Sequence, residues 1–323
     1  MRLTRRGFML GAGATLLYPG HALTARATAI IEGPAFGASW RAVLPPGTDA
    51  HAAGTALQSI VADVDGAMSP FRAGTEIGRF NAGDDTGWIA LAPQTREVVA
   101  EALRVARLTG GAFDPTVGPL VARYGFGPIT GSSDADHRDI ALGEAGLRKA
   151  DPALTLDLCG IAKGHALDRM AQALGAMGLS DFLIELGGEI LGRGRHPSGR
   201  RWHAGIERPL PGELSFQRVV DLGGLALATS GDRVNSYMVG ARRYGHIIDP
   251  AQGRPAAGPL ASVSVFAPRA VTADALATAL FAMGPEAGSD FARREAIPAL
   301  FLLRDGDGIR EIATGGFDAH ILS

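Results

Sequence analysis

The stretch TLDLCGIAKG, residues 155–164, joins a short apolar segment to a helical pattern through a glycine. We expect Thr155–Leu158 to form a strand that runs into a helix at about 162–177. Free amides at the amino end of that helix, with Lys163 on its first turn, suit a phosphate, and Gly160 lets a ligand approach the backbone closely. A strand-to-helix turn with an incidental lysine would look the same, so the stretch alone leaves both interpretations open.

The segments on either side predict a mixed α+β fold, because strands and helices alternate between turns rich in Gly and Pro. On the amino side we expect strands within 29–44 and 88–91 around a helix at 51–66, and a second helix that opens at Pro93 and ends near Gly110. The expected elements on the carboxyl side are strand 182–186, a meander of short strands from 200 to 249, strand 261–267, helices 272–283 and 286–295, and a closing hairpin at 299–313.

Residues 1–27 resemble a removable export signal. The arginine pair Arg5-Arg6 precedes an uncharged run from Phe8 to Gly20, and a small-residue stretch ends at Ala27. Paired arginines at this place resemble the twin-arginine signal, which exports folded proteins to the periplasm, and an ordinary signal that happens to carry two arginines is the alternative. Either signal predicts that the mature protein begins near residue 28 and works outside the cytoplasm.

The composition of the chain limits the classes of partner that we expect. Apolar residues make up 46% and the formal net charge is −2, so a nucleic-acid partner is not expected, and no second long apolar run predicts a membrane span. Cys159 is the only cysteine, which excludes an internal disulfide. We expect its side chain to be a small buried substituent rather than a reactive thiolate.

The helix expected at 272–283 carries oxygen ligands on one face. Thr272 is expected to cap it, and Asp274 and Thr278 stand four residues apart. A carboxylate and a hydroxyl side by side suit Mg²⁺, which fills its other positions with water and substrate phosphates. The alternative is that Asp274 only lies in the first helical turn, where the helix dipole favours its negative charge, and that Thr278 only packs against neighbouring side chains.

Two turn-rich segments add candidate groups. Residues 110–119 place Phe113 beside Asp114, a pairing that could hold an adenine or flavin ring. His246 lies in the segment 244–250 among other polar residues, and its ordinary pKa near neutrality suits a general base that activates a hydroxyl. A histidine hydrogen-bonded only for structure is the alternative.

Taken in order, these segments resemble the ApbE family of flavin transferases over nearly all of the mature chain. The matching motifs are residues 68–71 with 76–81, 111–120 with 124–128, 160–164, 185–189, 229–232, 246–250 and 274–278. The resemblance implies an α+β, T-fold-like architecture of largely antiparallel sheets with packed helices in two closely joined lobes. Residues 28–323 would then form one flavin transferase domain.

The resemblance also implies the residues of the site. Family positions that bind Mg²⁺ match Asp274, Thr278 and the backbone carbonyl of Gly160. Family positions that contact FAD match Phe71, Ala112, Phe113, Asp114, Asp157, Lys163 and His246. Asp274, Lys163 and His246 are the implied catalytic residues, with His246 activating the acceptor hydroxyl. The sequence departs from the family pattern in three places: Cys159 stands where glycine is usual, His165 stands where tyrosine is frequent, and the early Met-Gly-Thr motif appears only as Phe36-Gly37-Ala38.

The implied reaction is Mg²⁺-dependent transfer of FMN from FAD to a threonine or serine hydroxyl of an acceptor protein, with release of AMP. The implied acceptor is a membrane-bound redox subunit. Two alternatives stay open. A Mg²⁺-dependent FAD pyrophosphatase would use the same residues with water as the acceptor, and a periplasmic FAD-binding protein would bind FAD without releasing AMP.

Overall fold

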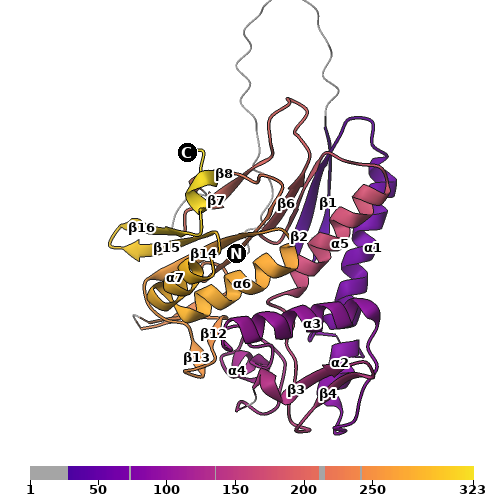
Figure 1. Ribbon diagram of the computed structural model, residues 1–323, viewed down its shortest axis with the longest axis vertical. Coiled ribbons are helices and arrows are strands. Elements are labelled where there is room, and N and C mark those ends of the chain that lie inside the picture. Colours follow the sequence, from indigo (N-terminus) through magenta and orange to yellow (C-terminus); the bar gives the residue numbers. More distant parts are fainter. Residues whose placement is uncertain (1–27, 73, 135, 211–214, 241) are drawn as a thin grey trace, which may run out of the picture.

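An eight-stranded antiparallel sheet organises the protein (Figure 1). The computed structural model describes residues 28–323 apart from 73, 135, 211–214 and 241, so the expected export signal at 1–27 lies outside the described residues. The strands, in their order across the sheet, are β1 (Ala29–Ala35), β2 (Ala38–Leu44), β5 (Phe182–Leu186), β6 (Glu189–Arg193), β9 (Ala226–Gly231), β14 (Leu260–Ala267), β15 (Ala299–Asp305) and β16 (Gly308–Thr314).

One face of this sheet is covered by helices α1 (Ala50–Met68), α5 (Ala162–Ala176) and α6 (Ala270–Met283), with α7 (Pro285–Arg294) beside α6. The buried positions of α1, which include Leu57, Val61 and Val64, recur at helical spacing, so this helix has one apolar face. By contrast, α6 is apolar on almost every side because it packs between the sheet, α3, α5 and α7. None of the helices in the described part of the chain combines the length and apolarity needed to cross a membrane.

The opposite face of the sheet is covered by the hairpin of β7 (His203–Glu207) and β8 (Phe216–Asp221) and by the short helix η2 (Phe317–His320). Residues of the strands from β2 to β16 across the sheet therefore enter two different cores. Val263 and Val265 of β14 point into the helix-side core, whereas Phe266 packs with Phe317 in the second core. All of β14 is buried, as expected for a strand that is covered on both faces.

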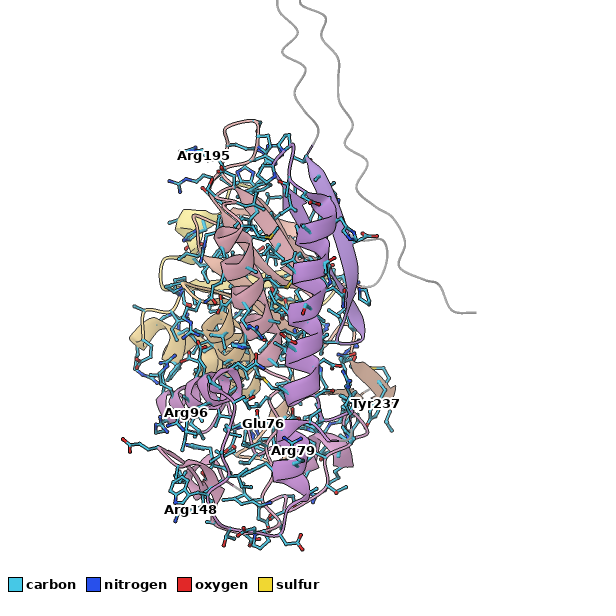
Figure 2. All side chains as sticks on the ribbon, turned by 90° about the vertical axis from the view of Figure 1, so that its right-hand side faces the viewer. Glu76, Arg79, Arg96, Arg148, Arg195 and Tyr237 are labelled. Atoms are coloured by element: carbon cyan, nitrogen blue, oxygen red, sulfur yellow. The ribbon has the colours of Figure 1, made fainter. Side chains whose placement is uncertain are left out.

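Residues 76–149 build the lower part of the molecule in Figure 1. They form α2 (Glu76–Ala82), α3 (Pro93–Leu108), α4 (Gly118–Arg123), η1 (His137–Asp139), β3 (Ile140–Gly143) and β4 (Gly146–Lys149). Arg96 of α3 donates to the carbonyl of Gly143 at 2.7 Å, and Figure 2 shows Arg96 and Arg148 in this lower part. Ile140 and Leu147 join the helix-side core, so this part is closely joined to the rest.

Two further hairpins complete the fold: β10 (Ser236–Val239) with β11 (Arg242–Gly245), and β12 (Ile248–Asp249) with β13 (Arg254–Pro255). The α+β class and the largely antiparallel pairing expected from the sequence are confirmed.

Two strand predictions were wrong. Thr155–Leu158 forms no strand, because the side-chain amide of Asn81 takes the place of a neighbouring strand: it accepts from Leu156 N at 2.7 Å and donates to Leu156 O at 2.8 Å. Residues 88–91 contribute only an isolated bridge between Ile89 and Leu147.

Candidate active site

The site begins where the backbones of α5 and α6 touch. A Cβ atom on Gly164 would lie 2.3 Å from the carbonyl oxygen of Ala270, so only glycine allows the two helices to approach this closely. Gly164 N donates to Asp274 Oδ2 at 2.9 Å. The contact therefore fixes the carboxylate of α6 against the first turn of α5.

The amino end of α6 is capped from another helix. Asp168 of α5 accepts from Ala270 N at 2.8 Å and from Val271 N at 3.1 Å. The prediction that Thr272 caps the helix was wrong: its hydroxyl donates instead to Glu101 of α3 at 2.6 Å. A cap supplied by a side chain about a hundred residues earlier leaves no local signal in the sequence.

The three predicted metal ligands come together at this contact. Asp274 and Thr278 lie one turn apart on α6, and a Cβ atom on Gly160 would stand 3.3 Å from Thr278 Oγ1. Ser230 of β9 adds another hydroxyl, with its Oγ 3.2 Å from Thr278 Oγ1. Ser230 was not among the predicted site residues, although its segment was.

This donor set fits Mg²⁺. Asp274 is 3% exposed, and burial raises the pKa of its carboxyl because one backbone N–H and the charge of Lys163 compensate only in part. A divalent cation would offset that desolvation, and a carboxylate with neighbouring hydroxyl oxygens is the hard-oxygen chemistry that Mg²⁺ prefers. The observation that favours a cation here is the buried carboxylate itself.

Lys163 and Glu189 form an ion pair beside this cluster. Glu189, the first residue of β6, is 1% exposed, whereas 31% of the Lys163 side chain reaches solvent. Burial lowers the pKa of Lys163, but the charges of Glu189 and Asp274 outweigh it and raise the pKa overall. Sequence reasoning placed Glu189 in a family motif but not in the site.

The loop with Phe113 and Asp114 packs against the same region. A Cβ atom on Gly160 would lie 3.3 Å from the ring of Phe113, and Asp157 N donates to Pro115 O at 2.7 Å. Ala112 stands half-buried next to the buried Phe113. The residues predicted to contact a flavin in this loop are therefore close to the predicted metal ligands.

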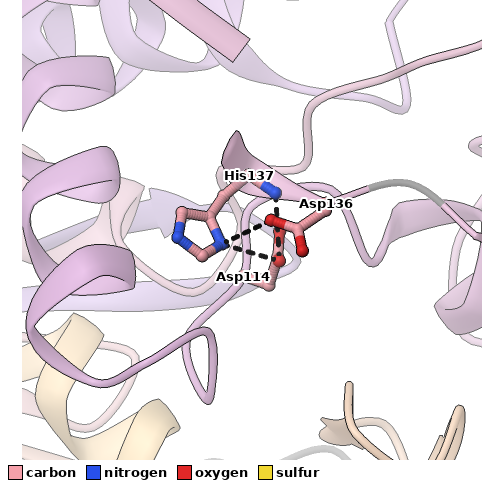
Figure 3. A group of neighbouring side chains, drawn as sticks. All are labelled: Asp114, Asp136 and His137. Atoms are coloured by element: carbon pink, nitrogen blue, oxygen red, sulfur yellow. Dashed lines mark hydrogen bonds and ion pairs between the residues drawn. The ribbon is translucent and has the colours of Figure 1, made fainter. Parts of the chain in front are cut away.

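Asp114 is committed to hydrogen bonds within the protein (Figure 3). Its Oδ1 accepts from Thr116 N at 2.8 Å and from Thr116 Oγ1 at 2.6 Å, and its Oδ2 accepts from His137 N at 3.2 Å. His137 Nδ1 lies 3.1 Å from Asp114 Oδ2 and 3.2 Å from Asp136 Oδ1, and Asp136 also accepts from Arg138. These bonds anchor η1 to the loop.

Asp114, Asp136 and His137 are also close enough together to surround a metal ion, the one such group of His, Cys, Asp and Glu side chains found among the described residues. Their oxygen atoms, however, already accept the N–H and O–H groups that hold the loop. His137 had not been singled out, because nothing in the local sequence links it to Asp114.

Asp157 shapes the turn before α5. Its Oδ1 accepts from Cys159 N at 2.9 Å, which closes a two-residue turn. Cys159 is exposed, so the expectation of a buried side chain was wrong. Its neighbour Leu158 is the buried residue of this turn.

His246 stands at the end of β11. Its Nδ1 lies 3.3 Å from Asn235 O, and its ring makes an edge contact with Phe126 at a centroid distance of 6.3 Å. Burial lowers the pKa of His246, and the charge of Lys163 lowers it further, against opposing effects of Asn235 O and Asp157. His246 is thus neutral near pH 7. It lies close enough to Lys163 and Asp157 for their charges to shift its pKa.

An aromatic cluster flanks this histidine. Phe126 stacks on Tyr237 at 5.4 Å, and Tyr237 stacks on Tyr244 at 5.5 Å. Figure 2 shows Tyr237 at the edge of the molecule.

Phe71 follows the end of α1 and is 68% exposed, and its contact with a flavin stays a prediction.

Comparisons with known proteins agree on one family. The ApbE family profile matches residues 36–301. A Vibrio cholerae protein named FAD:protein FMN transferase is 36% identical over 303 residues, covering 89% of this chain and 91% of that protein. The Escherichia coli K12 protein of the same name is 31% identical over 314 residues, with coverages of 91% and 89%.

Solved structures give the same result. The flavin transferase ApbE from Vibrio cholerae superposes with a TM-score of 0.82 at 34% identity, covering 91% of this chain and 99% of that one. The apo form of the Pseudomonas stutzeri flavinyl transferase ApbE gives a TM-score of 0.83 at 30% identity, with coverages of 93% and 98%. The resemblance seen in the motifs is confirmed, and the chain belongs to the ApbE family.

Proposed function

We propose that this protein moves FMN from FAD to a threonine or serine hydroxyl of an acceptor protein, with release of AMP and with Mg²⁺ as the required metal. The observation that carries the proposal is the gathering of Asp274, Thr278, Gly160 and Lys163 at the contact between α5 and α6. The relatives named FAD:protein FMN transferase support FAD as the donor and a protein as the acceptor.

In this proposal some residues neutralise charge on the phosphates and His246 accepts a proton. Asp274, Thr278 and the Gly160 backbone would hold Mg²⁺, which supplies positive charge to the pyrophosphate when bound. Lys163 adds its own positive charge where charge grows on the phosphate oxygens. The acceptor oxygen forms a bond to the FMN phosphorus, the bond from that phosphorus to the AMP oxygen breaks, and His246, neutral near pH 7, takes the hydroxyl proton.

The experiment that tests the reaction uses the mature protein with FAD and MgCl₂, with and without an acceptor protein, and follows AMP release together with acceptor mass. An acceptor heavier by one FMN, with equimolar AMP, supports the transferase. Free FMN and AMP without an acceptor adduct would identify the pyrophosphatase. FAD binding without AMP would identify a carrier, and the presence of both Asp274 and Thr278 argues against that alternative.

Asp274→Ala tests the metal site. The variant is expected to keep its circular dichroism spectrum and to lose Mg²⁺-dependent AMP release by about 10²–10³-fold, because the buried carboxylate of the metal site is removed. Asp290→Asn on α7 removes an exposed carboxylate and serves as the control with unchanged rate. An Asp274→Ala enzyme with full activity would contradict the assignment, and full transfer by His246→Ala at saturating FAD would contradict the role of His246.

We also propose that the protein acts after export, on a membrane-bound redox subunit. The support is the Arg5-Arg6 pair ahead of an uncharged run and the family resemblance. A tagged full-length chain is expected in the periplasmic fraction, and Arg5→Lys with Arg6→Lys is expected to retain it in the cytoplasm. Unaltered export of that variant would favour an ordinary signal.

A further inference from the structure

The turn between β5 and β6 is built to bring Glu189 to Lys163. Gly187 and Gly188 both have positive φ angles, of 62° and 115°, which glycine adopts without strain. A Cβ atom on Gly187 would stand 3.5 Å from Lys163 Cδ, so the turn packs against the aliphatic part of the Lys163 side chain. Glu185 Oε1 accepts from Gly188 N at 3.0 Å and holds the turn in place.

Stability alone does not account for this buried pair. Glu189 Oε1 contacts Lys163 Nζ, but Oε2 is buried and has no hydrogen-bond partner in the described part of the chain. Burying a carboxylate with one free oxygen opposes folding, and an apolar pair of similar size would often serve stability as well. A role in fixing the position of the Lys163 side chain would account for the pair better than stability does.

Lys163 has a second carboxylate within electrostatic reach. Gly164, the residue that follows Lys163, donates its backbone N–H to Asp274 Oδ2 at 2.9 Å, so Lys163 starts from the helical turn that holds this carboxylate. The charge of Asp274 also raises the pKa of Lys163. An ammonium free to swing toward Asp274 would neutralise the carboxylate that a cation needs. Glu189, on β6, offers the Lys163 ammonium another carboxylate to pair with in place of Asp274.

We propose that Glu189 is a positioning residue that holds Lys163 away from Asp274 and so keeps the Asp274 carboxylate available to the divalent cation. The inference rests on the proposed function, because it concerns the same metal site. It goes beyond that function in assigning to Glu189 a role in cation affinity without direct contact with the cation.

Isothermal titration of MgCl₂ into the mature protein at pH 8.5 tests this role, a pH chosen because burial raises the pKa of Glu189 to about 8. Glu189→Gln keeps the shape but loses the charge, and is expected to weaken Mg²⁺ binding by about tenfold. Glu185→Gln is the matched control on the same hairpin, because its amide oxygen can still accept from Gly188 N. Its Mg²⁺ affinity is expected to equal that of the wild type.

The double variant Lys163→Met with Glu189→Gln separates positioning from direct binding. Removal of the competing ammonium is expected to restore Mg²⁺ affinity to the wild-type level while AMP release stays slow. A double variant as weak as Glu189→Gln would show direct action on the cation and overturn the inference. Should Glu189→Gln not fold by circular dichroism, Glu189→Asp takes its place, because its shorter side chain keeps the charge but withdraws the carboxylate from Lys163 Nζ. Weaker Mg²⁺ binding by that variant supports the role, and wild-type binding overturns it.

The failures of the two proposals look different. A Glu189→Gln protein that folds and binds Mg²⁺ like the wild type overturns the inference and leaves the metal site intact. A wild-type protein that binds no Mg²⁺ overturns the metal requirement of the proposed function and this inference with it.

Discussion

Gly164→Ala tests whether the backbone contact between α5 and α6 sets the geometry of the site. The new Cβ would lie 2.3 Å from Ala270 O, whereas ordinary contact begins at 3.4 Å, so α6 must retreat by about 1 Å. Overpacking of this kind costs about 1–3 kcal/mol of unfolding free energy. The same movement carries Asp274 and Thr278 away from Lys163, and a misplacement of about 1 Å lowers rates on the order of 100-fold.

The assay compares the melting temperature and the rate of AMP release with those of the wild type. Gly175→Ala is the matched control on the same helix, because its Cβ would meet no atom within 4 Å. That control is expected to gain about 0.5–1 kcal/mol in stability and to keep its rate. A Gly164→Ala protein with wild-type melting temperature and rate would refute the reasoning. A lower melting temperature with an unchanged rate would confine the contact to a structural role.

Two further predictions concern buried basic groups. Lys149 is 1% exposed and its Nζ donates to the carbonyls of Phe80, Pro152 and Leu154, so Lys149→Met should lower the unfolding free energy by about 3–5 kcal/mol in guanidinium titrations, and an unchanged midpoint would contradict this. Burial lowers the pKa of His165 from 6.5 to about 4. The unfolded chain therefore binds more protons between these values, and the contribution of His165, complete above pH 6.5, should fall by up to about 3 kcal/mol as the pH drops toward 4. Urea unfolding at several pH values should show a shallower loss for His165→Gln, and an equal loss would argue against this assignment.

The fold was predictable where a segment carries its own signal. Pro93 at the start of α3 and the apolar periodicity of α1 are local features, and both helices lie where the sequence places them. The failures involve distant partners. Thr155–Leu158 has strand-like composition, but the Asn81 side chain, 75 residues away, pairs with its backbone. The hairpin β3–β4 was not among the elements expected from the sequence.

The site follows the same division. Asp274 and Thr278 are joined by helical spacing, and their neighbour Gly160 was linked to them only through the family pattern. Asp168, Glu189 and His137 were missed as site residues because each acts on a group that lies far along the chain or on another element. Such groups support the ligands rather than supply them, and no local spacing marks them.

The contact between Gly164 and Asp274 also has a consequence for how the enzyme is made. The two residues are separated by 110 positions, so α5 leaves the ribosome long before α6 has been translated. Until then the nascent chain has the first turn of α5 but lacks Asp274 and Thr278. If these two residues hold the metal as proposed, a chain that stops before α6 should be unable to cleave FAD, and activity should arise only when synthesis is nearly finished.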